Sequence, residues 1–278
     1  MDYLELYNGV KMPCVVMSTN YMNYQEMTTV VRAGLKLGYR AFDTARDYGN
    51  EHIVGKVMKE CLAEAGLKRE DVFITTKIGN SQQRLGNIDE QIDMSLNNLQ
   101  TDYVDLWLMH WPYPGYYVET WHKMEKVYKF GKAHAIGMAN YRMRHFEHLF
   151  KEGIDVMPHC IQMELHPMRI CTELLGYLHS RSIQVQAYTP LLRMIEPIRN
   201  NPILKRIALS HNKTIGQIIL RWHYQNKTVP VFKSFKPMRL AENINIFDFS
   251  LSDVEMSEIS SMDEDYKYHI ESASCPGF

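Results

Sequence analysis

Short apolar segments alternate with longer amphipathic segments along almost the whole 278-residue chain. The apolar segments have the length of strands, and the segments that follow them carry the 3.6-residue periodicity of helices. Eight such units in succession predict a closed parallel barrel, the (β/α)8 TIM barrel, rather than an open doubly wound sheet. The open sheet is further disfavoured because the chain contains no GxGxxG motif. The predicted strands are Val15–Thr19, Ala41–Thr44, Val72–Thr76, Val104–His110, Ala133–Ala139, Cys160–Leu165, Gln184–Tyr188 and Thr228–Phe232.

Segments at both ends add to this barrel. Asn8-Gly9 lies between short apolar runs, and both turn residues tolerate positive φ, so we expect an N-terminal β-hairpin. Two extra C-terminal helices are expected over Arg239–Asn245 and Ser252–Ser260. No low-complexity tract, charge run or flexible linker interrupts residues 1–278, which predicts one barrel domain.

Charge and cysteine usage argue against several classes of protein. The formal net charge is −1 without a basic stripe, which disfavours nucleic acid or an anionic membrane as partner. Met1–Glu5 does not resemble a signal peptide, and no apolar stretch approaches the roughly 18 residues of a membrane span. The five cysteines are scattered without a CxxC pair, so neither a disulfide framework nor a metal site is expected. We therefore expect a cytoplasmic protein, with a monomer as the default.

Ionisable residues stand at the ends of three neighbouring strands. Asp43, Lys77 and His110 each follow apolar strand residues, and Tyr48 comes shortly after Asp43. Taken singly, Asp43 is a helix cap or turn residue, Lys77 a solvated lysine and His110 a core histidine. Together they lie on adjacent strands at the end of the barrel where active sites are found. This coincidence favours a catalytic site.

The segments around these residues resemble the signature sequences of the aldo-keto reductase family. The resemblance runs in order along essentially the whole chain, so it is more specific than any single motif. It implies reduction of an aldehyde or ketone to the alcohol, and the nearest likeness is to shorter prokaryotic members such as diketogluconate and aldehyde reductases. The matching segments are Phe42–Ala45, Tyr48–Glu51, Thr75–Lys77, Asp102–Leu106, His110–Pro112, Ala135–Asn140, Gln162–Pro167, Ala187–Leu191, Lys233–Ser234, Arg239 and Glu242–Asn243.

The resemblance gives the four ionisable residues their expected roles. Tyr48 is the general acid, Lys77 assists it, Asp43 holds Lys77 charged, and His110 orients or polarises the carbonyl oxygen. A phenol with a pKa near the ordinary value of about 10 is a poor proton donor at neutral pH. Because a nearby ammonium favours the phenolate, we expect Lys77 to lower the pKa of Tyr48. NADPH is the expected cofactor and supplies the hydride.

Later strands are expected to hold the nicotinamide end of NADPH. By resemblance, Asn140 and Gln162 contact the nicotinamide, Tyr188 stacks on its ring, and Thr19 at the end of the first strand lies beside the cofactor. Without the resemblance, Gln162 and Tyr188 would be read as ordinary barrel packing. Ser18 and Ala139 depart from the usual family pattern at this end, which bears on cofactor affinity.

The opposite end of the cofactor is expected near a helix start. Lys233, Ser234 and Arg239 combine backbone N–H groups with two cations, a combination suited to a phosphate. The resemblance implies that they bind the 2′-phosphate of NADPH, while Glu242 and Asn243 contact the adenine. A solvated basic loop is the alternative. Leu192 stands where glycine is usual in the loop that clamps the pyrophosphate.

The substrate pocket is expected beside Asn20 and Trp111. A polar Asn20 where family members commonly have an aromatic residue favours a small polar carbonyl substrate over a bulky steroid. The short tail around Tyr268 and His269 either reaches this pocket or frays. Two other functions stay open: a non-catalytic barrel that senses the cofactor, and NAD(P)-dependent alcohol oxidation as the physiological direction.

Overall fold

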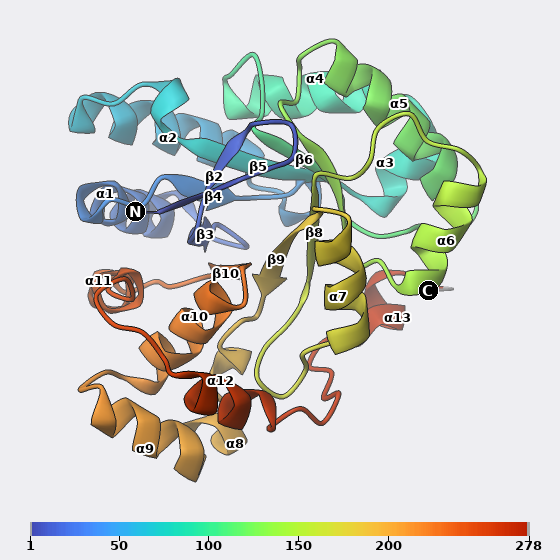
Figure 1. The fold of residues 1–278 in the computed structure, drawn as a ribbon. Coiled ribbons are helices and arrows are strands. Elements are labelled where there is room, and N and C mark those ends of the chain that lie inside the picture. The colour runs from blue at the N-terminus through green and yellow to red at the C-terminus, as the bar shows by residue number, and fades with distance from the viewer. Residues whose placement is uncertain (1, 277–278) are drawn as a thin grey trace.

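The computed structural model describes residues 2–276. Within that range, eight parallel strands close into a barrel in the order β10-β3-β4-β5-β6-β7-β8-β9 (Figure 1). The predicted (β/α)8 barrel is therefore confirmed. Its strands are β3 (Val16–Ser18), β4 (Ala41–Asp43), β5 (Phe73–Ile78), β6 (Leu106–Met109), β7 (Ile136–Ala139), β8 (Cys160–Glu164), β9 (Gln184–Tyr188) and β10 (Thr228–Phe232).

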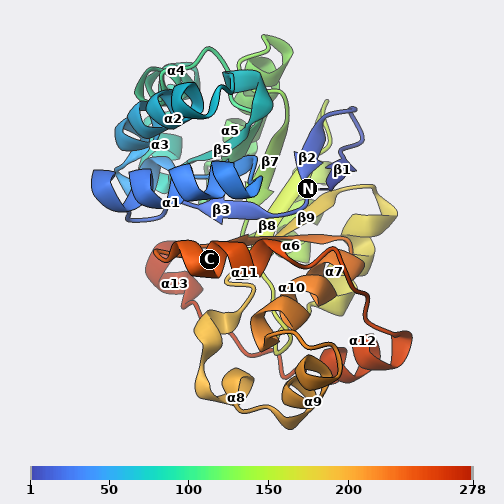
Figure 2. The ribbon, with the colours of Figure 1, turned by 90° about the vertical axis from the view of Figure 1, so that its left-hand side faces the viewer.

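Helices surround the barrel on its outer side (Figures 1 and 2). The last of the ring, α11, packs against the first, α1, and so completes the outer layer. The ends of α1 follow from local sequence: Asn23 and Glu26 form a reciprocal capping box, and Gly38 takes the left-handed conformation that stops the helix. The ring comprises α1 (Tyr24–Leu37), α2 (Glu51–Ala65), α4 (Ile88–Leu99), α5 (Tyr117–Lys129), α6 (Met143–Lys151), α7 (Thr172–Ser180), α10 (Ile215–Gln225) and α11 (Pro237–Ile244).

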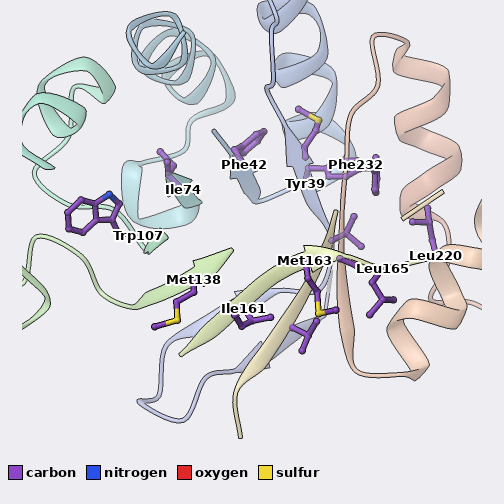
Figure 3. Packing of buried hydrophobic residues seen from close by; sticks show 14 of the residues in the cluster. Tyr39, Phe42, Ile74, Trp107, Met138, Ile161, Met163, Leu165, Leu220 and Phe232 are labelled. Atoms are coloured by element: carbon purple, nitrogen blue, oxygen red, sulfur yellow. The ribbon is translucent and has the colours of Figure 1, made fainter. Parts of the chain in front are cut away.

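Alternate residues of each strand face opposite sides of the barrel wall. Phe42, Ile74 and Trp107 belong to the large apolar layer between strands and helices (Figure 3). Their chain neighbours, such as Ala41, Phe73 and Leu106, belong to a separate inner cluster. Farther along the same strands the inward-facing residues become polar. Asp43 lies two residues after Ala41, Lys77 four residues after Phe73, and His110 four residues after Leu106. The barrel interior is therefore apolar at the strand starts and polar at the strand ends.

The predicted N-terminal hairpin is present as β1 (Tyr3–Glu5) and β2 (Lys11–Pro13), which pair antiparallel. Leu6 and Met12 of this hairpin are buried in the inner cluster together with residues from the starts of the barrel strands. Asn8 Nδ2 also donates to the carbonyl oxygen of His134 at 3.0 Å. The hairpin thus covers the N-terminal end of the barrel and leaves the opposite end as its mouth.

Further helices and short turns lie outside the ring of helices already described. The two predicted C-terminal helices are present as α11 and α12 (Asp253–Ser260), and α11 doubles as the eighth helix of the ring. The sequence pattern did not identify α9 (Pro202–Ser210), which lies beside α12 in both views (Figures 1 and 2). The remaining turns and helices are η1 (Arg46–Tyr48), η2 (Arg69–Asp71), α3 (Asn80–Leu85), η3 (Leu192–Met194), α8 (Glu196–Arg199) and α13 (Glu271–Ser274).

Among residues 2–276, none of the helices combines the length and apolar character needed to cross a lipid bilayer.

Candidate active site

A buried ion pair lies at the centre of the barrel mouth. The Lys77 ammonium donates to both carboxylate oxygens of Asp43 at 2.7 Å and to the carbonyl oxygen of Thr44 at 2.9 Å. Both side chains have essentially no exposed surface. Burial lowers the pKa of Lys77, while Asp43 opposes that shift. Because an unpaired charge at this depth is costly, each residue needs the other.

Tyr48 stands beside this pair. It ends the turn η1, which Gly49 closes in the left-handed conformation, and its hydroxyl lies 3.3 Å from the Lys77 ammonium. Burial, and then the negative charge of Asp43, raise the pKa of Tyr48 well above its ordinary value. The net shift is therefore opposite to the lowering expected from Lys77, because desolvation of the charged phenolate is its largest cause.

His110 lies directly after β6, with its ring edge-on to Tyr48 at a centroid distance of 5.9 Å. Its Nδ1 atom is 3.2 Å from a carboxylate oxygen of Asp47, the middle residue of η1. Burial lowers the pKa of His110 below its ordinary value, and Asp47 partly opposes this. The shift favours the neutral imidazole.

The amide side chains of Gln162 and Asn140 form hydrogen bonds with residues of the ionisable cluster. Gln162 donates to Asp43 at 2.8 Å and also to Gln186 at 2.8 Å. Asn140, at a positive φ of 64°, donates to the carbonyl oxygen of His110 at 2.9 Å and accepts from the Tyr188 hydroxyl at 2.6 Å. The structure thus joins the residues predicted for the nicotinamide end to the ionisable cluster itself.

Thr19 is fully buried, and its N–H and hydroxyl both donate to the Asp43 carbonyl oxygen, at 2.9 and 3.1 Å. It therefore ties the end of β3 to the end of β4. Asn20 follows it, and its side-chain oxygen is buried without a hydrogen-bond partner. Trp111 is also buried, with its ring beside that of His110 at a centroid distance of 6.5 Å, and its carbonyl oxygen accepts from Gln83 at 3.0 Å.

The residues predicted for phosphate binding lie on the β10 side of the mouth, where Lys233 and Arg239 are exposed and Ser234 is half-buried. The Lys233 ammonium donates to the Asn20 carbonyl oxygen at 3.1 Å. Ser234 accepts from the Lys236 N–H at 3.2 Å. Arg239, with 60% of its side chain exposed, contacts both carboxylate oxygens of Glu242 at 3.3 Å. This ion pair leaves the guanidinium reachable from solvent.

Other residues of α11 lie deeper. Glu242 also accepts a hydrogen bond from Thr214 at 2.7 Å, so its carboxylate is shared between α11 and the start of α10. Asn243 is buried. The predicted adenine contacts therefore stand next to Arg239, but Glu242 already has two protein partners.

The loop after β9 contributes a cation that the sequence pattern did not identify. Leu192, Arg193 and Met194 all have positive φ, between 43° and 54°, a conformation that side-chain-bearing residues rarely adopt. Arg193 is close enough to Lys233 to lower its pKa, although burial is the larger cause. Arg193 thus lies near Lys233, and its guanidinium lies over the Tyr268 ring, 5.0 Å from the ring centroid.

The C-terminal tail is docked on the mouth, so the fraying alternative does not hold for its described residues. Buried Glu164, at the end of β8, accepts hydrogen bonds from the backbone N–H groups of Tyr268 at 2.7 Å and of His269 at 3.0 Å. His269 also contacts the Thr189 hydroxyl at 3.0 Å and lies edge-on to the Tyr188 ring. The tail therefore covers the β8–β9 side of the mouth.

Three of these functional contacts carried little sequence signal. Asp47 could have been noticed as an acid directly before Tyr48, and Glu164 as the one charged residue of its strand. Arg193 carries no such signal, because its position depends on the left-handed turn around it. Within residues 2–276, no group of His, Cys, Asp and Glu side chains is arranged to hold a metal ion.

Comparisons with known proteins agree with this geometry. The family model described as "Aldo/keto reductase family" matches residues 15–264. Glyoxal reductase from Bacillus subtilis (strain 168) is 40% identical over 265 residues, which is 95% of this chain and 94% of that protein. A methylglyoxal reductase from Escherichia coli (strain K12) is 35% identical over 94% of this chain and 93% of its own length.

Solved structures give the same result. The aldose reductase of Schistosoma japonicum superimposes with a TM-score of 0.91 at 30% identity, covering 99% of this chain and 96% of that one. An aldo-keto reductase solved in complex with NADPH gives a TM-score of 0.89 at 29% identity, covering 96% of this chain and 89% of that one. With its barrel, its buried Lys77–Asp43 pair and this match along nearly its whole length, the chain belongs to the aldo/keto reductase family of oxidoreductases.

Proposed function

We propose that this protein is an NADPH-dependent reductase of small polar aldehydes and dicarbonyls, with Tyr48 as the proton donor. The observation that carries the proposal is the contact between the Tyr48 hydroxyl and the Lys77 ammonium, 3.3 Å apart, at the open end of the barrel. Lys77 is in turn held by Asp43. A protonated phenol next to a fixed cation is suited to giving a proton to a developing alkoxide.

The residues present fit NADPH. Lys233 and Arg193 lie near each other, and Arg239 offers an exposed guanidinium on α11, which together suit an anionic, phosphate-bearing cofactor. Asn140 and Tyr188 present an amide and an aromatic ring near His110. Asn140, Gln162, Tyr188 and Thr19 would lie at the nicotinamide end, and Lys233, Ser234, Arg239, Glu242 and Asn243 at the adenosine phosphate end.

Bound NADPH supplies a hydride to the carbonyl carbon. Tyr48 gives its proton to the carbonyl oxygen, and the phenolate that remains lies against the Lys77 ammonium. The raised pKa of Tyr48 keeps the phenol protonated between turnovers. Asp43 keeps Lys77 charged and in place, and Gln162 holds Asp43 from the far side.

Small polar substrates are favoured by the wall of the pocket. Asn20 is polar where family members commonly have an aromatic residue, and its side-chain oxygen has no hydrogen-bond partner within the described residues. The similar bacterial proteins are named for glyoxal and methylglyoxal. We therefore rank these dicarbonyls above steroid ketones as substrates.

The deciding experiment measures NADPH consumption with glyoxal, methylglyoxal, a keto sugar and a steroid ketone, in the parent protein and in Tyr48→Phe. Loss of the phenol should lower kcat by about 10²–10⁴-fold, the usual contribution of a general acid. Tyr3→Phe, on the exposed hairpin at the other end of the barrel, is the matched control and should behave like the parent.

NADPH binding, followed by protein fluorescence, should survive Tyr48→Phe. Near-parental kcat in that variant would remove Tyr48 from the acid role. Binding of NADPH without turnover of any carbonyl would instead favour a non-catalytic barrel that senses the cofactor.

We also infer a cytoplasmic monomer. All five cysteines are free thiols, as a reducing compartment would leave them. Cell fractionation and sedimentation velocity test the two statements separately.

A further inference from the structure

Asp47 is an acidic residue inside the site that has no role in the proposed reduction mechanism. Its carboxylate oxygen lies 3.2 Å from Nδ1 of His110, and its side chain is 39% exposed. Within residues 2–276, His110 is its one partner at ion-pair distance. The contact joins the turn η1 after β4 to the residue after β6.

The fold holds Asp47 in this position from two sides. On one side, η1 ends at Gly49 in a left-handed conformation, which fixes the turn. On the other side lies Gly79, the residue before α3. A Cβ at Gly79 would overlap the Asp47 carboxyl group, so any other residue there would force that carboxyl group out of its present position. Gly79 has an ordinary extended backbone, and its lack of a side chain is therefore needed for space rather than for conformation.

The chemistry of the contact determines which nitrogen of His110 carries the proton. An ionised carboxylate only accepts hydrogen bonds, so the nitrogen facing Asp47 has to be the donor. A neutral imidazole has one N–H, and when Nδ1 carries it, Nε2 is an acceptor. Within the part of the chain that the structure describes, no hydrogen bond to Nε2 competes with this arrangement.

The other charges around His110 do not replace Asp47. From β4 and β5 it faces Asp43 and Lys77, which neutralise each other at 2.7 Å. From η1 it faces the neutral phenol of Tyr48. Asp47 is thus the unbalanced charge beside the ring.

We propose that Asp47 is a positioning residue that holds neutral His110 as the Nδ1–H tautomer, so that His110 donates a hydrogen bond to a substrate carbonyl only when its ring is protonated. While the ring is neutral, Tyr48 is the sole donor to that oxygen, and Nε2 instead accepts from a substrate hydroxyl. This second statement rests on the proposed reductase function, whereas the tautomer does not.

The tautomer is measured directly by ¹⁵N NMR of the histidine-labelled, cofactor-free protein at pH 8. In the parent, His110 should show a protonated Nδ1 and an unprotonated Nε2. Asp47→Ala removes the acceptor, and Gly79→Ala displaces it without removing the carboxylate. Both variants should move the proton to Nε2. Asp89→Asn, which removes a carboxylate from the exposed start of α4, is the control and should leave the spectrum of His110 unchanged.

An Nε2–H tautomer in the parent protein overturns the proposal, and so does an Nδ1–H tautomer that persists in both variants. The NMR result needs no turnover, so it stands or falls separately from the reductase assignment.

The kinetic consequence is a pH profile. With a simple aldehyde lacking a hydroxyl, parental kcat/KM should rise by up to about tenfold per pH unit as pH falls toward the pKa of His110. In Asp47→Ala the neutral ring already offers an Nε2–H, so the profile should be nearly flat over the same range. Parallel profiles for the two proteins would overturn the role of Asp47 in substrate polarisation.

Discussion

The two sides of the barrel mouth differ in how fully the protein satisfies its own polar groups. On the catalytic side, formed by the ends of β4, β5 and β6, Lys77 and Asp43 are buried and bonded to each other. On the phosphate side, formed by η3, the end of β10 and α11, Lys233 and Arg239 are exposed and loosely paired. The first side is assembled in the absence of any ligand, whereas the proposed phosphate side would have to exchange partners on binding a phosphate.

This difference separates two tasks. Groups that stabilise charge in a transition state work best when they need no reorganisation, which requires partners supplied by the fold. Groups that capture and release a cofactor must remain reachable from solvent. Buried pairing therefore suits chemistry, and exposed pairing suits exchange.

Lys77→Met tests the catalytic side and should have the largest effect. It leaves the Asp43 carboxylate buried without its cation, which we expect to lower the free energy of unfolding by about 3–5 kcal/mol. Urea denaturation measures this change. Lys129→Met removes an exposed cation paired with Asp155 and should shift the midpoint far less. Equal shifts for the two variants would mean that breaking the buried pair costs no more stability than breaking an exposed one.

Arg239→Ala tests the phosphate side. A charge-assisted hydrogen bond to the 2′-phosphate is worth about 1.5–3 kcal/mol, so the Kd for NADPH should rise roughly 10–100-fold while the Kd for NADH stays within about twofold. Arg206→Ala, which removes an exposed arginine paired with Glu258, is the matched control. Equal losses for both cofactors would place the 2′-phosphate elsewhere.

A change in ionic strength should have the smallest of the three effects, and it compares the two sides of the mouth in one protein. Raising NaCl to about 0.5 M shortens the screening length to a few ångströms. The Kd for NADPH should therefore rise severalfold, because the cations of the phosphate side are exposed. The kcat at saturating NADPH should change little, because the Lys77–Asp43 pair is shielded by the protein. A kcat that falls together with NADPH affinity would erase the distinction between the two sides.

The fold and the placement of the main ionisable groups were predictable because they depend on local patterns. Each β-α unit shows its own periodicity, and alternation along β4, β5 and β6 places Asp43, Lys77 and His110 on the inward side. What escaped prediction depends on distant parts of the chain. Asp47 reaches His110 only because Gly79 makes room for it.

The docking of the tail and the raised pKa of Tyr48 could not be predicted from the sequence, for related reasons. Glu164 binds backbone N–H groups 104 and 105 residues away, a contact with no signature in side-chain type. The raised pKa of Tyr48 comes first from burial and then from the negative charge of Asp43. The depth of burial is a property of the folded barrel and cannot be read from the residues around Tyr48.

The buried pairing of Lys77 also bears on how long the protein would survive the dicarbonyls proposed as its substrates. Dicarbonyls are electrophiles that condense with unprotonated amines and with accessible guanidinium groups. Lys77 has no exposed surface, and its ammonium is held by carboxylate and carbonyl oxygens, so it offers neither access nor a lone pair. Arg239, 60% exposed, has no such protection. During prolonged exposure to dicarbonyls, modification of Arg239 should therefore weaken cofactor binding first, while Lys77 stays unmodified.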